Sequence, residues 1–413
     1  MNTFKQNLLW VSLTAVALTG CGSSSDDHDD NHDEHDHESS ILVSQNGTTT
    51  LSLLEEGELE ALDDAAAGNG ASLVLSETGA YAAVLAGSTV NFVHGLHEEE
   101  HEEEGHEEEE HEEAHVLDFS LTGSQVISTN GHFAVLNAGT TSFVPFDGLE
   151  TATEAEEDTS GLSLAETYPA LMIDEDHNLV MAFDGTEALI YEGVTEKANV
   201  ACANPSSHAQ GHEVVVVSCD EGAVAWVIEE GESGHTFEVE TYTDTELDGT
   251  ASNYVWRAQG EVIVGFEPNT SNYAVVELNE TSGELELVKS SDTGVFEFSD
   301  AICDIQLDSQ ATDILAISAG GEFVALNHEA EELQSITLDE SAETTCGDFV
   351  LASAAKAAVV VDNAAQMVFE IDVDDVESNP NGYHVHGREA LTVNDIESMV
   401  IFHEVETEGH EAH

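Results

Sequence analysis

Hydrophobic residues in this chain occur in short runs that begin at Ile41 and continue almost to the end, with polar breaks between them. The runs are rich in Val, Ala, Leu, Phe and Ile, whereas the breaks are rich in Gly, Asn, Asp and Ser. Few stretches are long enough for an amphipathic helix, and short apolar runs bounded by turn residues are typical of β-strands. The pattern therefore predicts an all-β protein.

The runs also recur in pairs, each of which reads as a strand, a tight turn and a second strand. The pairs begin at Tyr81, His132, Leu179, Val214, Glu261, Asp313 and Lys356, with a shortened copy at Glu397. Their usual interval of about 40 to 50 residues is that of a four-stranded propeller blade, and a plain β-sandwich would not produce it. We predict an eight-bladed β-propeller. Seven blades is the alternative, because the spacing from His132 through Leu179 to Val214 is uneven.

The two ends of the repeat array complement each other. The last copy, at Glu397, lacks its outer strand, while residues 41–56 supply a pair of strands that has no partner. If the N-terminal strands complete the final blade, the ring closes and both of these unpaired edges are removed.

The N-terminal region reads as an export signal followed by a linker. Lys5 precedes an apolar run from Leu8 to Leu18, and the sequence Leu-Thr-Gly-Cys then ends at Cys21. This is a secretory signal, residues 1–20, with a lipidation site at Cys21; the alternative is an uncleaved anchor, for which the run is short. Residues 21–40 contain almost no apolar side chain and are expected to form a disordered tether, so the folded domain is 41–413. A Gly after the cysteine favours the outer membrane of a Gram-negative cell and exposure to the periplasm.

Charge restricts the partners of the protein. The chain has 86 Asp and Glu against 6 Lys and Arg, for a formal net charge of −80. Nucleic acids and anionic lipid surfaces are repelled by such a protein, whereas cations are concentrated around it. We expect no nucleic-acid partner, membrane contact only through the lipid anchor, and a monomer.

Five cysteines are present, and Cys21 is assigned to the lipid. In an oxidising compartment the other four are expected to form two disulfides, Cys202 with Cys219 and Cys303 with Cys346. A thiolate metal site is the alternative, but the chain has no CxxC pair to support it.

The strongest chemical signal is a Glu-rich segment, residues 94–115. Its six histidines are His94, His97, His101, His106, His111 and His115. Imidazole nitrogen and carboxylate oxygen are ligands of divalent transition metals, and the dense glutamates can orient the imidazoles, so the segment is predicted to bind metal. A solvated acidic insertion with incidental histidines is the alternative. The same alternatives apply to His28, His32, His35 and His37 in the tether.

Two further pairs of histidines are candidate metal ligands. His208 and His212 lie between two paired cysteines, and His384 and His386 lie in residues 374–388. Residues 374–388 and 94–115 are each expected to join the outer strand of one blade to the inner strand of the next, beside the central channel. His132 and His177 are expected in hairpin turns as ordinary surface residues.

The segment after Cys202 resembles a known family. Residues Cys202, His208, Gly211, Cys219, Asp220, Glu221, Gly222, Ala223 and Val224, together with a His- and acid-rich insertion after an early blade, are similar to the AztD-type periplasmic zinc metallochaperones. The resemblance implies an exported β-propeller that holds zinc and passes it to the solute-binding protein of a zinc importer. Ligand types alone would also accept other divalent metals, copper above all. The insertion is richer in Glu here, and a lipid anchor replaces a freely diffusing form.

The sequence is therefore interpreted as a zinc-binding metallochaperone or zinc buffer rather than an enzyme. One alternative is a propeller enzyme, a lactonase or an oxidoreductase, although no nucleophile elbow or cofactor motif is present. The other is a non-catalytic scaffold that binds protein or glycan.

Overall fold

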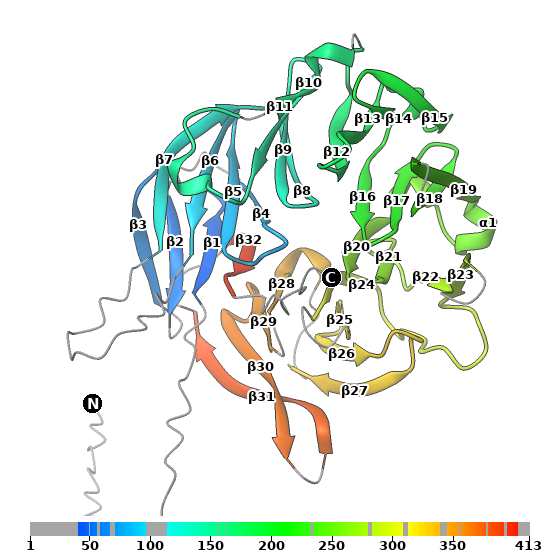
Figure 1. The fold of residues 1–413 in the computed structure, drawn as a ribbon. Coiled ribbons are helices and arrows are strands. Elements are labelled where there is room, and N and C mark those ends of the chain that lie inside the picture. The colour runs from blue at the N-terminus through cyan, green and yellow to red at the C-terminus, as the bar shows by residue number, and fades with distance from the viewer. Residues whose placement is uncertain are drawn as a thin grey trace, which may run out of the picture. The chain divides into compact units, whose positions relative to one another are not determined.

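The hydrophobic runs form strands, and these assemble into the eight four-stranded blades of a β-propeller (Figure 1). The prediction of eight blades is confirmed. The structure is a computed structural model that describes residues 40–48, 50–55, 58–66, 71–95, 114–155, 157–162, 164–231, 234–279, 283–308, 313–338, 345–354, 357–376, 379–391 and 395–403. The predicted signal, Cys21 and the tether with His28, His32, His35 and His37 lie outside these residues.

The strands of each blade follow one another from the centre of the ring outward. The first four blades are β4 (Ser72–Leu75), β5 (Tyr81–Ala86), β6 (Thr89–His94) and β7 (His115–Thr122); β8 (Gln125–Thr129), β9 (His132–Asn137), β10 (Thr140–Pro145) and β11 (Glu157–Asp158); β12 (Tyr168–Asp174), β13 (Leu179–Phe183), β14 (Glu187–Glu192) and β15 (Thr195–Ala201); β16 (Ser207–Gln210), β17 (Val214–Cys219), β18 (Gly222–Gly231) and β19 (Gly234–Tyr242). The next three are β20 (Val255–Gln259), β21 (Val262–Phe266), β22 (Tyr273–Asn279) and β23 (Glu284–Lys289); β24 (Ile302–Leu307), β25 (Ile314–Ser318), β26 (Glu322–Leu326) and β27 (Glu332–Thr337); β28 (Phe349–Ala354), β29 (Ala357–Asp362), β30 (Met367–Val376) and β31 (Asn379–Ala390). The short helices are α1 (Asp244–Leu247) and the 3-10 helices Leu149–Thr151, Thr159–Leu162, Ala251–Asn253 and Cys346–Asp348.

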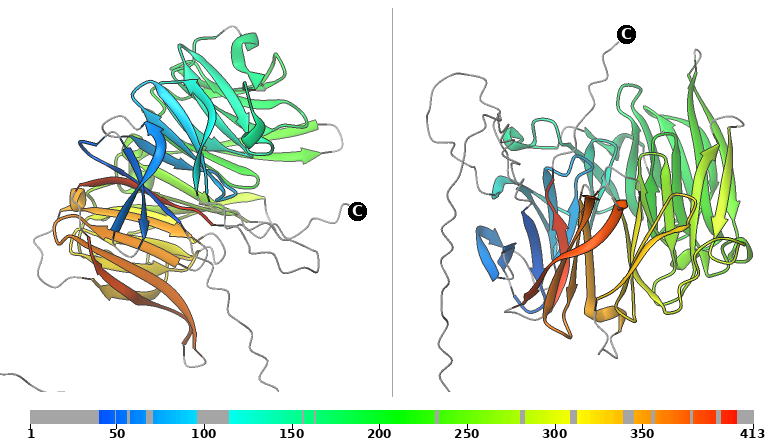
Figure 2. Two further views of the ribbon diagram at one scale, coloured as in Figure 1. Left: turned by 90° about the vertical axis from the view of Figure 1, so that its left-hand side faces the viewer. Right: turned by 90° about the horizontal axis from the view of Figure 1, so that it is seen from below.

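The position of a strand within its blade explains its composition. The second strand of a blade packs against the neighbouring blades on both faces of the sheet, so β17, with the sequence VVVVSC, is buried throughout. The outermost strand is covered on one side at most, and β15 is mostly exposed. The views in Figure 2 show the blades side by side around the ring. The hydrophobic pairs in the sequence are therefore the second and third strands of the blades.

The eighth blade closes the ring with strands from both ends of the chain. Its innermost strand is β32 (Ile396–Ile401), and β1 (Ile41–Gln45), β2 (Thr50–Glu55) and β3 (Glu58–Ala66) complete it. Ile41 of β1 pairs with Ile401 of β32, so the predicted closure is confirmed. The shortened copy at Glu397 is, however, an innermost strand and not a truncated second strand.

The strand order places specific turns on one side of the ring. Successive strands of a blade are antiparallel, so the turns between first and second strands and between third and fourth strands share a face. We call it face A; its turns include residues 130–131, 175–178 and 211–213. Chain entry before β1 and chain exit after β32 are on face A as well, because β1 is a second strand and β32 a first strand.

Two connections differ from the sequence-based expectation. Residues 94–115 run from the third to the outermost strand of one blade, β6 to β7, and His94 and His115 are paired in register. Residues 374–388 likewise belong to the β30–β31 hairpin of one blade. The expectation that these segments link neighbouring blades beside the channel was wrong, because β6 and β30 are third strands and the outermost strand of the same blade follows each of them.

The four cysteines of the propeller lie in the two expected pairs. The Cα atoms of Cys202 and Cys219 are 5.0 Å apart, and those of Cys303 and Cys346 are 4.6 Å apart, distances that disulfides span. Cys303 is in β24, and Cys346 begins the 3-10 helix that leads into β28, so the second pair lies between the innermost strands of two adjacent blades. None of the helices in the described residues has the length and apolar character needed to cross a membrane.

Candidate metal centre

A group of three potential metal ligands, Asp174, His177 and His235, lies on face A between two blades. Asp174 is the last residue of β12, and His177 is in the turn that leads to β13. His235 is near the start of β19 in the next blade, and its side chain contacts Asp174. The site therefore exists only when the two blades are packed together.

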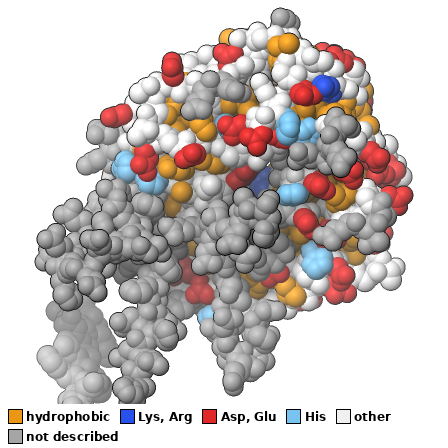
Figure 3. Space-filling view, viewed as in Figure 1, with side chains coloured by type: hydrophobic (Ala, Val, Ile, Leu, Met, Phe, Trp, Pro, Cys, Tyr) orange, Lys and Arg blue, Asp and Glu red, His pale blue; other side chains and the backbone are white. Residues whose placement is uncertain are grey.

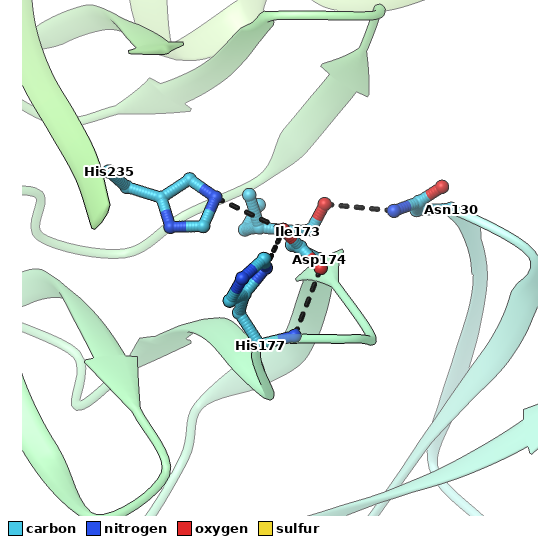
Figure 4. A network of polar contacts seen from close by, with 5 residues as sticks. All are labelled: Asn130, Ile173, Asp174, His177 and His235. Atoms are coloured by element: carbon cyan, nitrogen blue, oxygen red, sulfur yellow. Dashed lines mark hydrogen bonds and ion pairs between the residues drawn. The ribbon is translucent and has the colours of Figure 1, made fainter. Parts of the chain in front are cut away.

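The carboxylate of Asp174 connects the two imidazoles (Figure 4). Its Oδ2 atom is 2.7 Å from Nδ1 of His177 and 3.0 Å from Nε2 of His235. Its Oδ1 atom accepts a hydrogen bond from the backbone N–H of His177, which holds the turn in place. Asn130, in the turn after β8, donates a hydrogen bond to the carbonyl of Ile173 and so ties the end of β12 to the preceding blade.

The donor set and its dimensions fit a divalent transition metal. One ligand atom from each residue lies within 4.8 Å of the other two. Zinc bonds to nitrogen and oxygen of about 2.0–2.2 Å place tetrahedral ligand atoms about 3.4 Å apart, so small side-chain rotations would suffice. The side chain of His235 is 7% exposed and that of His177 is 44% exposed, so the group has one buried wall and one side open to water.

The electrostatics of the group favour a charged carboxylate. Partial burial raises the pKa of Asp174, but the hydrogen bonds from His177 and the charges of the two imidazoles together lower it below its ordinary value. Asp174 is therefore available as an anionic ligand at neutral pH. Asp and Glu side chains lie close to several histidines on the face seen in Figure 3, and the excess of 86 Asp and Glu over 6 Lys and Arg attracts cations to the protein.

A pocket of about 480 Å³ opens beside the three residues. Its lining includes Asp174 and His235 of the group and also His212, in the turn after β16. His212 is exposed, and its backbone N–H is bonded to the carbonyl of Gly260 in the next blade. This predicted ligand therefore borders the pocket of the three-residue group without being a member of it.

His208 has a different environment from its predicted companion His212. It lies in β16, where Nδ1 is 3.0 Å from the hydroxyl of Tyr168 and Nε2 is 3.4 Å from the carbonyl of Ser128. Burial is the main cause that lowers the pKa of His208 to about 4; the hydrogen bond to the Ser128 carbonyl opposes this effect, and the nearby Arg257 guanidinium adds to it. The structure thus places His208 in a hydrogen-bonded interior position, apart from Asp174, His177 and His235.

The two ends of the His/Glu-rich segment meet on face A. The ring of His94 stacks on Tyr81 at 4.8 Å and meets the edge of the His115 ring at 5.5 Å. Nδ1 of His94 is 3.2 Å from a carboxylate oxygen of Glu150. His94 is buried and His115 exposed, so the segment begins and ends beside a small imidazole and carboxylate cluster. The other predicted ligands of the segment, His97, His101, His106 and His111, lie outside the described residues.

The remaining histidines are distributed over other parts of the ring. His384 and His386 are in β31, an outermost strand, with His384 opposite Asp372. His132 begins β9 and is buried, so the expectation that it is a surface residue was wrong. His177 is exposed in a hairpin turn as expected, but it is grouped with two other potential ligands.

Sequence reasoning missed Asp174 and His235 and dismissed His177. The spacing of Asp174 and His177, three residues apart in a predicted turn, is a local signal that could have been noticed. No local signal connects them to His235, which reaches the turn from another blade.

Structural comparisons agree with this architecture. The chain is similar to two structures of AztD from Citrobacter koseri, one of them described as apo AztD. The TM-scores are 0.66 and 0.65 at 13% sequence identity, and the matches cover 88% of this chain and 97% and 98% of those chains. A putative 6-phosphogluconolactonase from Bacteroides uniformis ATCC 8492 has a TM-score of 0.47 at 12% identity, and the match covers 88% of this chain and 99% of that one. No family model matches the sequence, and no curated protein is similar to it in sequence. The protein thus has the propeller fold of AztD, as the resemblance in its sequence predicted.

Proposed function

We propose that this protein is a zinc-binding metallochaperone or zinc buffer on the periplasmic side of the cell envelope. The observation that carries the proposal is the group of Asp174, His177 and His235, which offers three convergent ligands at the edge of an open pocket. Three protein ligands leave a coordination position for an incoming group, whereas a structural zinc site has four and is closed. Such a site can both hold an ion and release it.

The His/Glu-rich segment supports the same role as a capture region. His94 and His115, the residues at its two ends, are held on face A, which also carries the three-residue site. Many weak and overlapping ligand sets bind metal quickly and exchange it quickly, so ions collected there can reach the firmer site. We infer the choice of zinc, and of a zinc importer's solute-binding protein as recipient, from the family resemblance. Export and a lipid at Cys21 remain parts of the proposal.

The test is a zinc titration of the full chain against a competing chelator, with the double variant His177→Ala/His235→Ala. We expect the highest-affinity site to be lost in the double variant, while weaker uptake by the His/Glu-rich segment remains. His328→Ala is the matched control, because His328 is an exposed turn histidine in another blade. The proposal fails if the wild-type protein takes up no zinc at micromolar concentration or if the double variant keeps the tightest site.

Transfer is tested separately, by mixing the zinc-loaded protein with an apo solute-binding protein and following the metal in each. A chaperone transfers zinc faster than a small chelator of equal affinity does. A scaffold with incidental histidines gives no such acceleration, and a lactonase or an oxidoreductase would instead turn over a lactone or an alcohol.

A further inference from the structure

A glutamate outside the three-residue group stands beside the turn that carries His177. Glu192 is the last residue of β14 and pairs with Leu179 of β13, two positions after His177. The next residue, Gly193, donates its backbone N–H to the carbonyl of Asn178 at 2.9 Å. The β13–β14 pairing therefore fixes the backbone of Glu192 next to the metal-site turn.

This glutamate is held by one of the few basic residues of the chain. Lys197, in β15, forms an ion pair with the Glu192 carboxylate, and the two side chains are 37% and 45% exposed. The hydrogen bond and charge of Lys197 lower the pKa of Glu192, and the charges of His177 and His235 lower it further. The carboxylate thus lies within electrostatic reach of both imidazoles. Only 6 Lys and Arg stand against 86 Asp and Glu in the sequence, so a lysine at this place requires an explanation beyond general solubility.

We propose that Glu192 is an exchangeable fourth ligand, which moves between Lys197 and a metal ion held by Asp174, His177 and His235. This inference rests on the proposed function. Carboxylate oxygen is an accepted zinc ligand, and three ligands leave one tetrahedral position to fill. Both side chains are long and partly exposed, so rotation between the two partners costs little. Lys197 competes with the ion for the same carboxylate, which weakens binding and speeds release.

The experiment compares Lys197→Met, Glu192→Gln and the double variant in the full chain, with zinc alone as the probe. Affinity is measured by chelator competition and release by the rate of zinc loss to excess chelator. We expect Lys197→Met to raise affinity and slow release about tenfold, and Glu192→Gln to lower affinity about tenfold, as changes around a metal site commonly do. Because Lys197 acts through Glu192, its substitution should have little effect in the Glu192→Gln background.

Lys289→Met is the matched control. Lys289 is also a partly exposed lysine in an ion pair, 3.1 Å from a carboxylate oxygen of Asp248, but it belongs to another blade. The proposal is overturned if Lys197→Met and Lys289→Met change zinc affinity equally, or if the gain from Lys197→Met persists without the Glu192 carboxylate. Loss of tight binding in His177→Ala/His235→Ala together with either result overturns the ligand exchange alone. Unchanged binding in that double variant overturns the proposed function as well.

Discussion

Each end of strand β12 contacts a histidine of the neighbouring blade, and the two contacts differ in their chemistry. At the first residue of the strand, the hydroxyl of Tyr168 contacts His208 of β16. At its last residue, the carboxylate of Asp174 contacts His235 of β19. The strand and the blade are the same, so the difference comes from the partner group and from access to water.

Partner and solvent together decide what each imidazole can do. His208 is partly buried, has a phenol and a carbonyl as neighbours, and is neutral at pH 7 because loss of solvation lowers its pKa to about 4. His235 instead faces a carboxylate, a second imidazole and an open pocket. An imidazole whose two nitrogens have hydrogen-bond partners stabilises the contact between blades, whereas an imidazole beside a carboxylate at a pocket edge can bind a cation.

The largest expected effect tests the carboxylate end of this comparison. Asp174→Asn keeps the shape of the side chain but removes the anionic ligand that both imidazoles share. We expect zinc affinity to fall at least about 100-fold, since even outer partners of metal ligands are worth 10- to 100-fold. Competition with a chelator at pH 7 measures it.

Asp176→Asn is the matched control for this prediction, because Asp176 is an exposed carboxylate in the same turn. It changes the net charge equally and should have a much smaller effect. Equal losses in the two variants would mean that general negative charge, and not the Asp174 position, attracts the ion.

The comparison also shows what the sequence could and could not predict. The second and third strands of each blade are largely buried on both sides, so β13 and β14 can be recognised in the sequence as apolar runs. The outermost strands do not: β15 has the sequence TEKANVA and is mostly exposed. The number of blades was therefore predictable. Residues 94–115, however, were expected to connect two blades, whereas they connect the third and fourth strands of one blade.

The site was less predictable than the fold, for a physical reason. Histidine density identifies segments that can collect metal, but a defined site depends on which side chains tertiary packing brings together. His235 is an isolated histidine in the sequence, and it is a candidate metal ligand only because packing places it beside Asp174. His208 lies in a segment with a second histidine and two cysteines, which made it a stronger candidate in the sequence. In the structure its ring nitrogens instead form hydrogen bonds at the contact between two blades.

An intermediate effect is expected at the phenol end of the strand. As pH falls below about 6.5, His208 takes up a proton in the unfolded chain but not in the folded protein, where its pKa is about 4. The unfolded state is thus favoured by acid in this window. Replacement by glutamine removes this proton uptake, so His208→Gln should lose less stability on acidification than the wild type does.

The measurement is the free energy of unfolding in urea at pH 7 and pH 4.5. We expect the wild type to lose about 2 kcal/mol more than His208→Gln over this interval. Buried carboxyls such as Glu166, whose pKa burial raises, act in the opposite direction but are common to both proteins. Parallel pH curves would show that His208 titrates normally. If His208→Gln also lowered zinc affinity at pH 7, His208 would again be a candidate metal ligand.

The smallest effect on zinc affinity is expected for Asn130. This prediction tests whether Asp174 and His177 are positioned by their own turn or by the contact with the preceding blade. Asn130 donates the side-chain hydrogen bond that ties Ile173, next to Asp174, to the preceding blade at 2.8 Å. Its φ of 27° lies in the left-handed region, so glycine is the substitution that removes the hydrogen bond without adding backbone strain. Asn130→Gly should lower the free energy of unfolding by about 1 kcal/mol, the usual worth of one such bond.

Zinc affinity should change less than threefold in Asn130→Gly, about 0.6 kcal/mol, because Asp174 and His177 are held by their own turn. The backbone N–H of His177 bonds to Asp174 within that turn, independently of the Asn130 contact. Chelator competition beside urea unfolding separates the two quantities in one variant. A tenfold fall in affinity with little loss of stability would show that the preceding blade positions the carboxylate. The two ends of β12 would then both depend on contacts between blades, and only the chemistry of the partner group would distinguish them.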